Sequence, residues 1–140
     1  MVEPTPGQIV DSRALSTAAG VNCGVLIVEG STHGEDGALS TDAASVGFPV
    51  GFSVFQIAKE PTVPNYQEFD MVPCLRRGRI WLPCSGTISD GEHALFIVHA
   101  TGLPSETDDA STTPPPAGQF IRCLKGNTTG LLGLFEISLC

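Results

Sequence analysis

Glycine and proline recur along the whole chain, and they restrict its fold more than any other feature. The 140 residues include 16 glycines and 11 prolines, which are scattered rather than gathered in one linker. They divide the sequence into runs that are too short for several stable helices but long enough for strands of about five or six residues. These runs are rich in the Val, Ile and Phe residues that strands favour. The sequence therefore predicts an all-β fold.

Short apolar runs separated by turn signals predict about seven strands. They lie at residues 22–28, 51–57, 69–75, 79–85, 94–100, 118–124 and 132–140. Strands of this length and spacing predict a single compact β-barrel or sandwich. The polar stretches at residues 30–45 and 102–117 are interpreted as solvated loops, the second being rich in Pro, Ser and Thr.

The clearest local prediction is a hairpin centred near Gly78. Residues 69–75 and 79–85 flank an Arg-Arg-Gly triplet, and its glycine can adopt the positive φ of a tight turn. Pro73 and Pro83 lack a backbone donor, so we expect an edge or a bulge at these positions. Residues expected in the core are Phe52, Val54, Ile80, Leu82, Phe96, Val98, Ile121 and Phe135.

The N-terminal segment allows two interpretations. Residues 8–19 contain no Gly or Pro, and Val10, Ala14 and Ala18 recur at helical spacing. The apolar face of such a helix would be thin, which favours an extended arm. We expect residues 1–20 to form this arm and to lie on a neighbouring molecule, with residues 21–140 as the β domain. The expected interface residues are Pro6, Gln8, Ile9, Val10 and Leu15.

The charge balance excludes several classes of partner. A formal net charge of −8 and a pI near 4.6 oppose binding to phosphate backbones, so we expect no nucleic-acid partner. No run of about 18 apolar residues predicts a membrane span, and the start of the chain lacks the features of a secretory signal. Synthesis and retention in the cytoplasm are therefore expected. The low charged fraction of 16% favours a homo-oligomer.

The sequence shows no pattern typical of a catalytic, cofactor or metal site. Five cysteines without a CxxC pair predict neither disulfides nor zinc, and the register of the expected hairpin places Cys74 away from Cys84. His33, His93 and His99 are not spaced as a ligand set. No nucleophile elbow or phosphate loop occurs, so we expect no enzyme activity, no cofactor and no metal.

The order of several short segments resembles a known family. These segments are TPGQIVD at 5–11, CGVLIV at 23–28, GFSVF at 51–55, DMVPCL at 70–75, GRIWL at 78–82 and TISDG at 87–91. The set is similar to the structural cement, or capsid decoration, proteins of tailed bacteriophages. In that family a Pro-Gly-Gln segment leads into a compact β domain with a strand, a Trp-containing hairpin and an Asp-Gly turn.

The resemblance implies a structural role on a virion. Such proteins lie on the outer capsid surface and stabilise contacts between major capsid protein subunits, often as trimers. The expected partners are therefore the major capsid protein and further copies of this chain. The alternative is a ligand- or carbohydrate-binding β module of a phage tail or fibre, although Trp81 and Tyr66 are the only aromatic residues besides phenylalanine.

Overall fold

The computed structural model describes residues 2–3, 8–17, 19–30, 35–39, 49–54, 65–89, 91, 95–98, 100–114, 119–127 and 132–139. These residues form strands, turns and loops without a helix, which confirms the all-β prediction. No helix suited to crossing a membrane occurs in this part of the chain.

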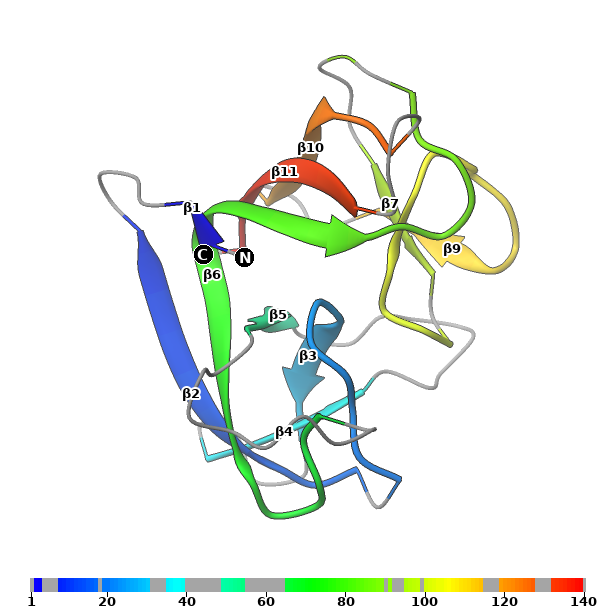
Figure 1. Ribbon diagram of the computed structural model, residues 1–140. Helices are drawn as coiled ribbons and strands as arrows, with labels where there is room; N and C mark the ends of the chain where they lie inside the picture. The colour runs from blue at the N-terminus through cyan, green and yellow to red at the C-terminus, as the bar shows by residue number, and fades with distance from the viewer. Residues whose placement is uncertain are drawn as a thin grey trace.

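The strands form one large sheet and one small sheet in a sandwich-like arrangement (Figure 1). They are β1 (Val2–Glu3), β2 (Ile9–Leu15), β3 (Leu26–Glu29), β4 (Asp36–Leu39), β5 (Pro49–Ser53), β6 (Met71–Pro83), β7 (Phe96–Val98), β8 (Pro104–Ser105), β9 (Thr112–Thr113), β10 (Phe120–Lys125) and β11 (Leu132–Ser138). The large sheet has the order β10-β11-β6-β2-β4-β3-β5, with β1 also pairing β6. The small sheet has the order β8-β7-β9.

Strand β6 replaces the predicted hairpin, which was wrong. It runs unbroken through Gly78, because Arg77 and Gly78 pair with Ser138 and Ile137 of β11. Gly78 has a φ of 141°, and Figure 1 shows a strong bend in β6 instead of a reversal. The glycine therefore allows the strand to change direction while its backbone groups remain paired.

The prolines of β6 lie where a missing donor is tolerated. Pro83 is its last residue, and the carbonyl of Pro73 accepts a hydrogen bond from Val54, just beyond the end of β5. The bulge expected at these prolines is not there. The register between β2 and β6 shifts instead between Ile9 and Val10.

Two groups of buried side chains hold the sheets together. The larger contains Leu26, Val28, Phe52, Leu75, Ile80, Leu82, Ile88, Leu95, Ile97, Ile121, Cys123, Phe135, Ile137 and Leu139. The smaller contains Leu15, Val21, Ile27, Val50, Tyr66, Val72 and Cys74. Strand β6 supplies both groups, with Val72 and Cys74 in the smaller one and Leu75, Ile80 and Leu82 in the larger one.

Most of the predicted core is confirmed. Five of the eight expected residues are buried: Phe52, Ile80, Leu82, Ile121 and Phe135. Val54 is half-buried and packs against the larger group. The prediction for β7 selected the wrong face, since Ile97 is buried whereas Phe96 and Val98 are half-buried. A three-residue strand provides too little alternation to identify its inner face.

The N-terminal segment is neither a helix nor an arm that leaves the domain. Residues 9–15 form β2, which pairs antiparallel with β6, and β1 pairs with β6 at Ile80 and Arg79. The segment therefore fills one edge of β6, satisfying backbone groups that would otherwise lack partners. Within β2 the period of two places Leu15 in the core, where it is 1% exposed.

The two predicted loops contain strands. Strand β4 lies within residues 30–45 and joins β3 to the end of β2. A Cβ atom added to Gly37 of β4 would lie 2.6 Å from Cγ2 of Ile27, so glycine permits this close packing. Strands β8 and β9 lie within residues 102–117 and pair with opposite edges of β7. Tertiary pairing thus orders segments whose composition is typical of loops.

Candidate interaction surface

One face of the large sheet is open to solvent over the second half of β6 and over β10 and β11. Along these strands alternate residues point into the core, and the residues between them point outward. The outward residues, which we call the outer face, are Arg77, Arg79, Trp81, Pro83, Phe120, Arg122, Lys125, Leu132, Leu134, Glu136 and Ser138.

The strand register arranges the outer face in rows across the sheet. In the central row, Glu136 lies between two arginines, at 2.8 Å from Nη2 of Arg122 and 3.5 Å from Nε of Arg79. All three side chains are partly solvent-exposed, so each ion pair contributes little to stability. Two guanidinium groups therefore share one carboxylate.

The rows on either side combine basic and apolar residues. On one side Arg77 and Ser138 align with Phe120, which is 41% exposed. On the other side Leu134 lies between Trp81 and Lys125. Leu132, which is 45% exposed, pairs with Pro83 at the end of β6. The outer face is therefore a basic surface interrupted by exposed apolar side chains.

The structure places some of the interface residues expected from the sequence on the surface and one of them in the core. Ile9 pairs with Arg77 and extends the row that contains Phe120, while Gln8 and Val10 are also exposed. Leu15 is a core residue and was wrongly assigned to an interface. Pro6 lies outside the described residues.

Sequence reasoning missed the outer face as a unit. The alternation in residues 77–83 contains part of the necessary signal, since basic and apolar residues occupy every second position there. The predicted turn at Gly78 concealed it, because a reversal there separates Arg77 from Arg79. The three histidines considered as ligands also lie outside the described part of the chain, and the residues within it contain no cluster suited to a metal ion.

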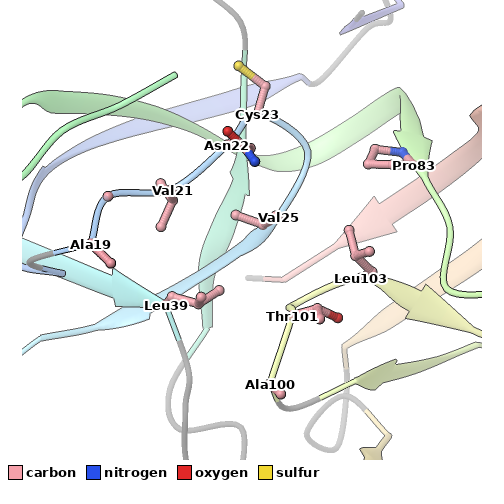
Figure 2. A pocket seen from close by; sticks show the side chains of 11 residues that line it. Ala19, Val21, Asn22, Cys23, Val25, Leu39, Pro83, Ala100, Thr101 and Leu103 are labelled. Atoms are coloured by element: carbon pink, nitrogen blue, oxygen red, sulfur yellow. The ribbon is translucent and has the colours of Figure 1, made fainter. Parts of the chain in front are cut away.

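A separate pocket of about 560 Å³ lies between the two sheets and is mostly apolar (Figure 2). It is lined by Ala19, Gly20, Val21, Asn22, Cys23, Val25, Leu39, Pro83, Ala100, Thr101 and Leu103. Burial raises the pKa of the Cys23 thiol, which therefore stays protonated near neutral pH and is a weak nucleophile. The pocket offers apolar contact and no activated group.

Comparison with known proteins identifies the family. Residues 1–139 match the family described as "Structural cement protein (E217 gp24/Pam3 gp6)". This chain belongs to the structural cement protein family. A capsid cement role and a location on the virion capsid agree with the sequence-based interpretation, and the tail or fibre alternative is not favoured.

A solved structure shares the fold of this cement protein. The structure, "The capsid of Myoviridae Phage XM1", has a chain that superposes with a TM-score of 0.75 at 11% sequence identity. The match covers 99% of the cement protein and 88% of the other chain. No curated protein sequence matches.

Proposed function

We propose that this cement protein binds the outer surface of a phage capsid and stabilises contacts between major capsid protein subunits. The family match over residues 1–139 is the observation that carries the proposal. A net charge of −8 suits the exterior, because the inner surface faces packaged polyanionic DNA. The role requires binding and no catalytic step, and it is compatible with synthesis in the host cytoplasm.

The start of β2 is one proposed contact. Strand β4 pairs with β2 only at Ala14 and Leu15, so the earlier part of β2 has an open edge among the described residues. Ile9 and Val10 lie on this edge and are 42% and 49% exposed. Exposed apolar side chains beside unpaired strand groups are suited to binding another protein. We therefore retain Gln8, Ile9 and Val10 as proposed interface residues.

Self-association is a further part of the proposal. A chain with 16% charged residues and exposed apolar side chains gains from covering part of its surface with another copy. A trimer would present its contacts to the shell several times, and linked contacts raise the total affinity without strengthening any one of them.

Reconstitution on capsids tests this function. Particles assembled without the cement protein should bind hundreds of copies when it is added, and they should then lose DNA at a higher temperature than before. The variant Ile9→Lys/Val10→Lys should fold but bind more weakly. A handful of copies per particle, or binding without any change in heat resistance, would contradict the proposal.

A further inference from the structure

We propose that the outer face docks on the capsid and receives an acidic protein surface that also carries apolar side chains. This inference rests on the proposed function and assigns to it a contact face and a partner chemistry.

The distribution of charge supports an acidic partner. The chain has seven basic residues and a net charge of −8, yet four of the seven lie on the outer face. Elsewhere in the described residues, Arg13 and Arg76 both lie within 4 Å of the Asp11 carboxylate. The outer face therefore concentrates positive charge on an otherwise acidic molecule, and carboxylates are its complement.

Two cations are available for such carboxylates. Arg77 and Lys125 are exposed and lie in different rows, on either side of the row that contains Glu136. Among the described residues neither has an ion-pair partner, in contrast with Arg79 and Arg122. A bound partner can thus pair with Arg77 and Lys125 without breaking an ion pair of the native fold.

The apolar residues indicate a protein partner. Phe120 and Leu132 are each more than two-fifths exposed, and Trp81 and Leu134 form the row between Leu132 and the row that contains Glu136. Aromatic side chains and arginine are enriched in protein interfaces. Nucleic acid requires a continuous basic stripe, whereas this face places Glu136 at its centre on a chain of net charge −8.

A symmetric contact between two copies through this face is unfavourable. A two-fold interface brings one surface against itself, and here that would bring together two faces of the same net positive charge. The face spans about 10 Å across the three strands and about 20 Å along them. This area is smaller than the roughly 800 Å² that each partner buries in a standard interface, so each contact is weak and stability depends on many copies.

The closing experiment compares two variants that remove equal charge. Arg77→Gln/Lys125→Gln lowers the charge of the outer face by two. Thr107→Glu/Ala110→Glu lowers the net charge by the same amount on the exposed loop between β8 and β9. Binding to capsids assembled without the cement protein is measured at several salt concentrations, after unfolding curves show that both variants are folded.

We expect the outer-face variant to bind about tenfold more weakly per chain and with a smaller salt dependence, and the loop variant to bind as the wild type does. Equal binding by both variants, or equal weakening, overturns the inference while the proposed function stands. The inference is also overturned if the outer-face variant binds capsids more weakly only because a homo-oligomer dissociates, or because binding to duplex DNA is lost. A wild-type protein that does not bind capsids would instead contradict the proposed function itself.

Discussion

Two phenylalanines on adjacent strands have different roles at the residue scale. Phe135 of β11 is fully buried in the larger core group, whereas Phe120 of β10 is 41% exposed on the outer face. Successive side chains of a strand point to opposite faces of the sheet. Phe135 lies opposite the buried Cys123, whereas Phe120 lies opposite Ser138 on the other face. Burial therefore separates side chains that stabilise the fold from those available to a partner.

Replacing these two residues should give very different losses of stability. Phe135→Ala removes a fully packed ring and should lower the free energy of unfolding by about 3–5 kcal/mol. Phe120→Ala, as the matched control, should lower it by less than about 1 kcal/mol. Urea unfolding monitored by Trp81 fluorescence measures both, and comparable losses would contradict the assignment of the two faces.

Cys74 should make stability sensitive to alkaline pH. Burial, with a smaller contribution from Asp11, raises its pKa from 9.0 to about 12, although Arg13 and Arg76 oppose the shift. Between about pH 9 and pH 12 the unfolded chain loses a proton that the native thiol keeps. The free energy of unfolding should therefore fall by up to about 1.4 kcal/mol per pH unit from this group, with no such effect below pH 9.

The variant Cys74→Ala tests this linkage. It should be less stable at neutral pH but should show a shallower decline between pH 9 and pH 12. Tyr66, whose pKa is raised mainly by burial, should contribute to the decline in both proteins. Identical slopes in the two proteins would exclude Cys74 as a source of the pH dependence.

At the scale of elements, one glycine holds the small sheet against the large one. Gly102 follows β7, its carbonyl accepts a hydrogen bond from Leu26, and its amide donates to Val98. A Cβ atom at this position would lie 2.9 Å from the backbone nitrogen of Leu26. The β7–β8 turn can therefore approach β3 only with glycine at this position.

Gly86 provides a matched control for Gly102. The φ angles are 74° and 70°, but a Cβ atom on Gly86 would meet nothing within 4 Å. Gly86→Ala should cost about 1 kcal/mol from backbone strain alone. Gly102→Ala should cost a further 1–3 kcal/mol, roughly, because Leu26 must move. Equal melting temperatures for the two variants would show that the close contact with β3 is unimportant.

At the scale of the whole molecule, β6 joins the two ends of the chain. Its two halves pair with β1 and β2 from the N-terminal region and with β11 from the C-terminal region. Most of the fold is thus built from contacts between segments distant in sequence, and the molecule should unfold as one unit.

Deletion of residues 2–12 should therefore abolish cooperative folding. The deletion removes β1 and much of β2, which leaves one edge of β6 without its partners. The full-length variant Ile9→Lys/Val10→Lys keeps the backbone pairing and should still melt cooperatively. A truncated protein that melts like the full-length chain would show that β2 is dispensable, as expected for a detached arm.

The sequence by itself determined the strand content, much of the core and the family. Short runs between Gly and Pro predicted the all-β class, and the predicted strands placed Ile121 and Phe135 inside, as β10 and β11 do. These features depend on neighbours within a few residues, where local chemistry carries the information.

Only the tertiary structure decided how these strands connect and which surface they expose. Gly78 permits a turn or a bend equally well, and ladder partners on both sides of β6 selected the bend. The same partners drew residues 9–15 into the sheet and ordered β4, β8 and β9 within polar segments. The outer face followed, since its residues come from three strands aligned by register. Pairing between distant segments is a property of the folded chain, so local sequence patterns did not reveal it.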